Sequence, residues 1–227
     1  LSDVVHTSGS LSELLKMGPI VHKSLKSLSF SMSDTSRYTP AYRQTHSILR
    51  HLNAPNLSLV SLNFGLHEER ETVFFSLTPV ASTPLASSLV DLRISNTYLD
   101  RPDTLYALQN LPSILHLHLC DNEWSGGDSS SFGMELFAFM ADEVDPLLPH
   151  LESLFLRERT QGNRSLSPIV IAACLESRWG SLQCEVDPGK WRLRKVGFGV
   201  TSCNFRENYD ALILKWQERG FELSILT

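Results

Sequence analysis

A short apolar phrase recurs along the chain: an apolar residue, any two residues, a second apolar residue, any one residue, and a third apolar residue. The last two apolar positions alternate with polar ones, which is the period of a β-strand with one buried face. We therefore expect a strand at each copy, and a further short strand over 221–226. The six copies are Leu25/Leu28/Phe30, Leu59/Leu62/Phe64, Leu89/Leu92/Ile94, Ile114/Leu117/Leu119, Leu151/Leu154/Leu156 and Leu193/Val196/Phe198.

Helical patterns separate the copies. A proline in the first turn of a helix is a good start signal, and a glycine just beyond the last turn is a good stop signal. Gly220 is such a stop. The expected helices begin at Thr39-Pro40, Arg101-Pro102-Asp103 and Ser167-Pro168, and span Phe132–Asp142 and Asn208–Arg219; single helical turns are expected at Thr78-Pro79 and Thr83-Pro84.

Alternating strands and helices with short links predict a parallel sheet with right-handed crossovers. Two architectures meet this condition. The strands of a doubly wound sheet are buried on both faces and are apolar throughout, whereas here polar residues alternate with the apolar ones, as Asp91 and Arg93 do in the third copy. A sheet with one solvent-exposed face favours a leucine-rich-repeat solenoid. This is an α/β fold with a curved parallel sheet on its concave side and helices on its convex side.

The repeats are degenerate. The middle positions of successive copies are 34, 30, 25, 37 and 42 residues apart, which is longer and less regular than standard leucine-rich repeats. Leucine is nonetheless abundant, with 37 in 227 residues. We expect residues 1–227 to form a single domain of about six repeats, with a C-terminal cap near 205–227 in which Trp216 seals the core.

Composition and charge exclude several classes of protein. Apolar residues make up 42% of the chain and charged residues 20%, which is typical of a globular domain rather than a disordered or membrane protein. The net charge of −5 argues against a nucleic-acid binder that neutralises phosphates. The four cysteines Cys120, Cys174, Cys184 and Cys203 have neither zinc-ligand spacing nor C-x-x-C pairing, so we expect packed thiols in an intracellular protein of the cytoplasm or nucleus.

Several segments together resemble the C-terminal leucine-rich region of F-box-like proteins of mushroom-forming fungi (basidiomycetes). They are Leu111–Leu117, Leu147–Leu154, Leu175-Glu176-Ser177-Arg178-Trp179, Leu193–Val196 and Gly220–Ile225. The resemblance implies a substrate-recognition region of an adaptor in a cullin-based ubiquitin ligase. Its F-box, which binds the ligase adaptor and cullin, would lie upstream of Leu1, since none is visible in the chain.

The expected binding surface is the concave face of the sheet and one flanking loop. By the strand alternation, the face carries Asp91, Arg93, His116, His118, Phe155 and Arg157, and the glycine-rich loop Cys120–Ser131 carries Trp124. Because interfaces favour Trp and Arg, we expect these residues to contact a protein substrate. We expect no catalytic residue, cofactor, metal, nucleic acid or membrane partner; His116-x-His118 with Asp91 is interpreted as a solvated polar surface rather than a metal site.

Two alternatives stay open. The first is a leucine-rich scaffold that shares the fold and has no link to ubiquitin. The second is an enzyme on a doubly wound sheet, with a site at the strand ends near Cys120, Asp121 and Gly197. Against the enzyme, Gly197-Phe198-Gly199 lacks the third glycine of a nucleotide-binding loop, and the nucleophile-elbow and P-loop patterns are absent.

Overall fold

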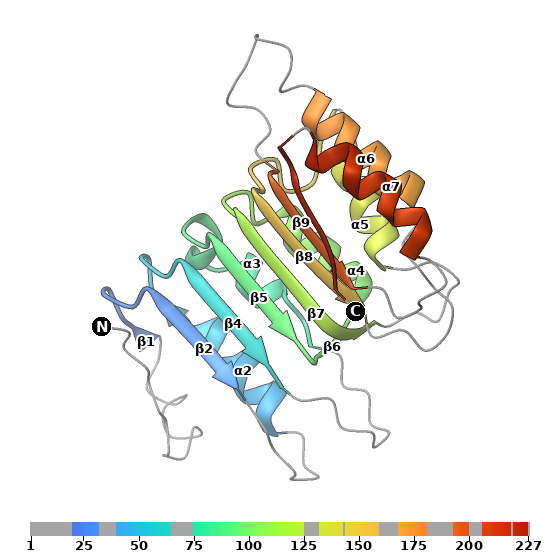
Figure 1. Ribbon diagram of the computed structural model, residues 1–227. Coiled ribbons are helices and arrows are strands. Elements are labelled where there is room, and N and C mark those ends of the chain that lie inside the picture. Colours follow the sequence, from blue (N-terminus) through green and yellow to red (C-terminus); the bar gives the residue numbers. More distant parts are fainter. Residues whose placement is uncertain are drawn as a thin grey trace.

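The fold is α/β, with a parallel sheet of seven strands in sequential order (Figure 1). The computed structural model describes residues 20–31, 40–64, 75–124, 132–142, 144–158, 168–180, 193–199, 206–218 and 220–226. Strand follows strand across the sheet in the order β2, β4, β5, β7, β8, β9 and β10, and every pair is parallel. These strands span Ser27–Ser31, Leu59–Asn63, Asp91–Ser95, His116–Trp124, Ser153–Glu158, Lys195–Gly199 and Glu222–Leu226.

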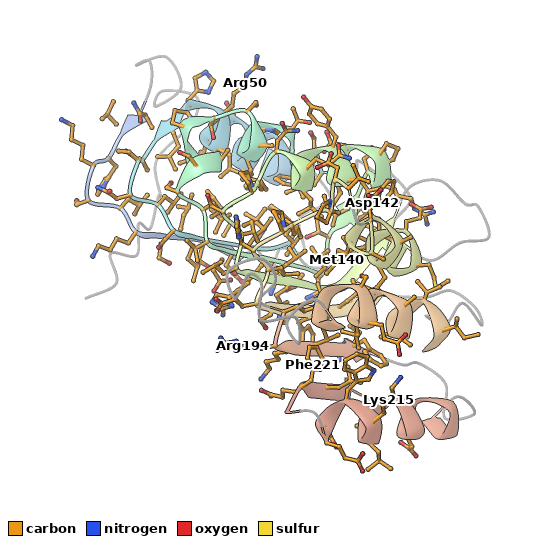
Figure 2. The ribbon with its side chains drawn as sticks, turned by 90° about the horizontal axis from the view of Figure 1, so that it is seen from above. Arg50, Met140, Asp142, Arg194, Lys215 and Phe221 are labelled. Carbon is orange, nitrogen blue, oxygen red and sulfur yellow. The ribbon has the colours of Figure 1, made fainter. Side chains whose placement is uncertain are left out.

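Helices follow most of the strands and lie on one side of the sheet (Figures 1 and 2). Two of them begin at the predicted residues: α6 starts at Pro168, and α4 starts at Arg101 with Pro102 in its first turn. The predicted stop signal Gly220 follows the end of α7 and has a φ of 81°. The bounds are α2 Pro40–His51, α3 Thr78–Ala81, α4 Arg101–Gln109, α5 Phe132–Met140, α6 Pro168–Gly180 and α7 Arg206–Gln217, with a 3₁₀ turn η2 at Pro84–Ser87.

Two small pairings accompany the main sheet. β1 (Ile20–Val21) pairs with β3 (Leu52–Asn53), and β6 (Tyr98–Leu99) pairs with the far end of β7. A doubly wound sheet would carry helices on both faces and reverse its strand order at one point. The described strands show no reversal, which removes the architecture on which the enzyme alternative was based.

The core lies between the sheet and the helices. In each strand from β4 to β10, alternate apolar residues point to the helix side, and those described there are at most 2% exposed. Met140 of α5 is fully buried on the inner side of its helix (Figure 2). At the β2 end, the equivalent Leu28 and Phe30 are only partly buried.

A repeated hydrogen-bond pattern joins each strand to the next. The carbonyl oxygen of Lys26 accepts from the N–H groups of both Ser58 and Leu59, at 2.9 and 3.1 Å. The carbonyls of Ser58, Val90, Leu115 and Glu152 each accept two N–H groups at the equivalent position of the following strand. One backbone geometry therefore recurs through the sheet, although the intervals between strands differ in length.

The register corrects the second copy of the apolar phrase. Leu28 pairs with Val60, and Val60 pairs with Leu92, so the second copy is Leu57/Val60/Leu62 rather than Leu59/Leu62/Phe64. The prediction was wrong because apolar residues at 59 and 64 fit the same spacing two residues later. In the structure Phe64 lies just past β4, where its ring packs against Phe75 at 5.2 Å. The first two intervals thus become equal, at 32 residues each.

Candidate functional site

The sheet face opposite the helices, which we call the open face, carries three rows of side chains set by the strand register. The middle row runs from Arg93 in β5 through His118 in β7 and Phe155 in β8 to Gly197 in β9. The upper row contains Asp91, His116, Ser153, Lys195 and, in β10, Glu222 at the corresponding positions. The third row brings Ser95, Cys120 and Arg157 together. Six of the seven predicted site residues therefore occupy one contiguous surface.

His118 and Phe155 form the centre of this surface. Their rings are stacked, with centroids 4.2 Å apart and an interplanar angle of 5°. Both side chains are partly buried, because each ring covers its neighbour. A stacked pair of this kind is a rigid, flat platform that still has an edge in solvent.

Gly197 makes room for the Phe155 ring. A Cβ at Gly197 would lie 2.9 Å from Phe155 Cδ2 and 3.2 Å from the Oγ of Ser224. Real Cβ atoms do not approach other atoms so closely. Gly197 lies inside β9 rather than after a strand, and the group that passes close to it is this ring. The contact was not predicted, since only the strand register brings the two residues together.

Asp91 and Arg93 form an ion pair along β5. Arg93 Nε donates to both carboxylate oxygens of Asp91, at 3.0 and 3.2 Å, and Nη2 donates to Oδ2 at 2.7 Å. The hydrogen bonds to Asp91 raise the pKa of Arg93 above its ordinary value, with a smaller opposing effect from burial. The guanidinium is thus held in a fixed orientation while its side chain stays 53% exposed.

The other charged groups of the open face flank this centre. His116 is exposed in the upper row, and Arg157 is half-buried beside Cys120. Lys195 of β9 pairs with Glu222 of β10 across the strands, a contact that no local sequence pattern indicates. At the described positions of the three rows, the charged residues other than histidine are Asp91, Arg93, Arg157, Lys195 and Glu222.

Trp124 does not lie in a loop at the rim of the face. β7 continues from His116 to Trp124, and the backbone of Trp124 pairs with Leu99 of β6. The polar run after Cys120 suggested a turn, but a register shift between Cys120 and Asn122 lets the chain continue as a strand. The remainder of the predicted loop, 125–131, lies outside the described residues.

Among the described residues, no three His, Cys, Asp or Glu side chains gather in a way that could hold a metal ion. The ring of His118 is stacked on Phe155, and the carboxylate of Asp91 is engaged by Arg93. Cys174 is fully buried in α6, and Cys184 and Cys203 lie outside the described residues.

The C-terminal end of the sheet is closed by α7. Trp216 is fully buried, and its ring meets Phe221 edge-on at 6.0 Å. Lys215, labelled on α7 in Figure 2, pairs with Glu176 of α6, so Glu176 joins two helices. Trp216 therefore packs where a terminal cap was predicted. The side chains of Arg178 and Trp179 lie outside the described part of the chain.

No helix in the described part of the chain is both long enough and apolar enough to cross a membrane. Comparison of the chain with protein-family models, with curated proteins and with solved structures finds no match. The role of the open face is therefore inferred from its own residues.

Proposed function

We propose that the chain is a protein-binding module that holds its partner on the open face of the sheet. The observation that carries this proposal is the in-register row of Arg93, His118, Phe155 and Gly197. Arginine and aromatic residues are enriched at binding hot spots, and here they are held in place by neighbouring side chains rather than left mobile.

The same proposal treats the fold as a leucine-rich-repeat solenoid. Three observations support this part of the proposal. The parallel strands follow one another in sequence order, the helices lie on one side, and a backbone carbonyl that accepts two N–H groups recurs from strand to strand. Solenoids of this type offer a long strand-lined surface to partners. A rigid surface of that kind suits recognition of a protein segment better than it suits chemistry on a small molecule.

From the resemblance to fungal F-box-like proteins, we further propose that the bound partner is a substrate of a cullin-based ubiquitin ligase. In that arrangement an F-box in the same polypeptide would contact the ligase adaptor, and the open face would present the substrate. A leucine-rich scaffold without a ubiquitin link uses the open face in the same way. The two forms of the proposal therefore differ only in whether the adaptor binds.

The experiment is affinity purification of the full-length protein encoded by the natural transcript. A double variant, Arg93→Glu with Arg157→Glu, reverses charge on the open face. A control, Arg50→Glu with Lys215→Glu, makes the same charge change on the exposed surfaces of α2 and α7. We expect the first variant to lose a partner that the wild type and the control retain.

Each outcome has a defined meaning. Retention of every partner by the open-face variant would refute binding through this face. Recovery of a cullin adaptor with the full-length protein would support the ligase role, and its absence would leave the scaffold form of the proposal. Circular dichroism of each variant shows whether the fold survives the substitutions.

A further inference from the structure

The middle row of the open face joins a cation to an aromatic platform at a fixed separation. Arg93, His118 and Phe155 occupy consecutive positions on β5, β7 and β8. Neighbouring strands are about 4.8 Å apart, so the backbone positions of Arg93 and Phe155 are separated by about 10 Å. A ligand that reaches both must therefore present two groups at that distance.

Arg93 retains hydrogen-bonding capacity after it has paired with Asp91. The pair uses Nε and Nη2, and Nη1 makes no hydrogen bond to any described residue. The Arg93 side chain is 53% exposed, whereas that of Asp91 is 14% exposed. Asp91 thus fixes the orientation of the guanidinium through Nε and Nη2 and leaves the side that carries Nη1 open. A second carboxylate can bind there, because its two oxygens match the planar guanidinium group.

Phe155 supplies the second contact. Its ring is fixed between His118, stacked at 4.2 Å, and the bare backbone of Gly197. Because both sides of the ring are covered, a partner ring meets its edge. Since the Phe155 ring is already ordered, this contact forms at little cost in conformational entropy. Aromatic pairs contribute beyond the area that they bury, which favours an aromatic partner over an aliphatic one.

We propose that this row is a receptor for an extended segment of a partner protein that carries an acidic residue and, three positions away, an aromatic residue. A segment in the polyproline II conformation advances about 3.1 Å per residue and repeats every three residues, so side chains three positions apart point the same way. They lie about 9 Å apart, which matches the separation of Arg93 and Phe155. The acidic side chain pairs with Arg93 and the aromatic ring packs on Phe155 and His118. The segment crosses the strands rather than adding to the sheet. This inference rests on the proposed function and specifies the class of partner.

The charge distribution supports an acidic segment. At the described positions of the three rows, basic residues outnumber acidic ones by three to two, although the chain as a whole has a net charge of −5. Asp91 and Glu222 are each engaged by a neighbouring cation. At the described positions of the three rows, an acidic group that approaches Arg93 therefore meets no carboxylate other than Asp91 and Glu222, each of which is already paired with a cation.

The test is selection of binding peptides from a displayed library of random twelve-residue sequences, with the purified chain as bait. We expect enrichment of an Asp or Glu three positions from a Phe, Tyr or Trp. With Arg93→Glu as bait, the preference at the charged position should change to Lys or Arg, and the selected wild-type peptide should bind at least about tenfold more weakly. Phe155→Leu should weaken the aromatic preference and keep the acidic one.

The matched control is Arg50→Glu, which makes the same charge change on the exposed surface of α2, on the helix side of the sheet. Its selected peptides should keep the wild-type motif. Selection without the acidic–aromatic spacing, or an Arg93→Glu bait that selects the wild-type motif, would overturn the proposal. The proposed function is tested separately, because loss of a natural partner in the Arg93 and Arg157 double variant does not depend on which peptides the library yields.

Discussion

The ring of Phe155 in β8 lies against the backbone of Gly197 in β9. A Cβ added to Gly197 would be 2.9 Å from one ring carbon and 3.3 Å from the next. On its other side the ring is stacked on His118. The position of the stacked His118–Phe155 pair is thus determined from both neighbouring strands, and it depends on the absence of a side chain at residue 197.

Gly197→Ala should destabilise the chain and displace the Phe155 ring. The added methyl group meets a ring that is held on its far side by His118, and overpacking of this kind costs about 1–3 kcal/mol. Denaturant unfolding gives the free-energy change, and the NMR shifts of the Phe155 and His118 rings report the displacement.

A double-mutant cycle isolates the cause. If the ring is the obstacle, Gly197→Ala should cost much less in a Phe155→Ala background, because the methyl group then enters vacant space. An equal cost in both backgrounds would show that the ring does not determine the effect.

Asp103→Ala should destabilise the chain, because it removes the hydrogen bonds that join α4 to residues 76–78 at the start of α3. The Asp103 carboxylate accepts from Ser76 Oγ at 3.0 Å, from the backbone N–H of Leu77 at 2.7 Å and from Thr78 Oγ1. Hydrogen bonds to a charged group contribute about 1.5–3 kcal/mol each and are not additive, so we expect a loss of about 2–4 kcal/mol in the free energy of unfolding.

The control for this prediction is Asp145→Ala, which removes an exposed carboxylate of the same type. Exposed substitutions away from such contacts usually change stability by less than about 0.5 kcal/mol. A cost for Asp103→Ala no larger than that of the control would contradict a role for Asp103 in joining the two segments.

Trp216→Ala should be among the most destabilising substitutions in the chain. Trp216 of α7 is fully buried and packs on Phe221, and truncation of a buried aromatic residue costs about 3–5 kcal/mol. Its neighbour Lys215 is 45% exposed and pairs with Glu176, so Lys215→Ala should cost about 1 kcal/mol or less. Thermal unfolding of both variants separates packing from the surface ion pair, and similar melting temperatures would refute the assignment of Trp216 as the cap.

Local sequence pattern predicted the elements well, because the signals for strand alternation and helix starts lie within a few residues. Pro168 opens α6, Gly220 follows α7, and a strand lies at each of the six copies of the apolar phrase. The second copy of the apolar phrase was assigned wrongly because the local pattern is ambiguous there. Both Leu57/Val60/Leu62 and Leu59/Leu62/Phe64 satisfy the local pattern, and only pairing with the neighbouring strands decides between them.

The candidate site was predictable to the same extent. Arg93 lies two residues from Asp91, so strand alternation alone places the two on one face, where they form an ion pair. The contact between Phe155 and Gly197 joins residues that are 42 positions apart, and no local signal indicates it. Trp124 was misplaced because its strand depends on β6, a partner of only two residues.

Asp142 gives the chain a pH-dependent contribution to stability at the end of α5. Asp142 Oδ1 accepts from the backbone N–H groups of Asp145 at 3.1 Å and Val144 at 2.8 Å, and these bonds lower the pKa of Asp142 below its ordinary value of 3.8. A carboxylate whose pKa is lower in the folded chain stabilises it above the unfolded pKa, and this contribution is lost as the pH falls through the folded pKa. Asp142→Ala should therefore be less stable than the wild type at pH 7, and this difference in the free energy of unfolding should shrink below pH 3.8. The control is Asp142→Asn, which has no titrating carboxyl, so its stability should differ from that of Asp142→Ala by the same amount at every pH. Carboxyl NMR titration of Asp142 measures the midpoint directly, and a midpoint at or above 3.8 would contradict the two hydrogen bonds.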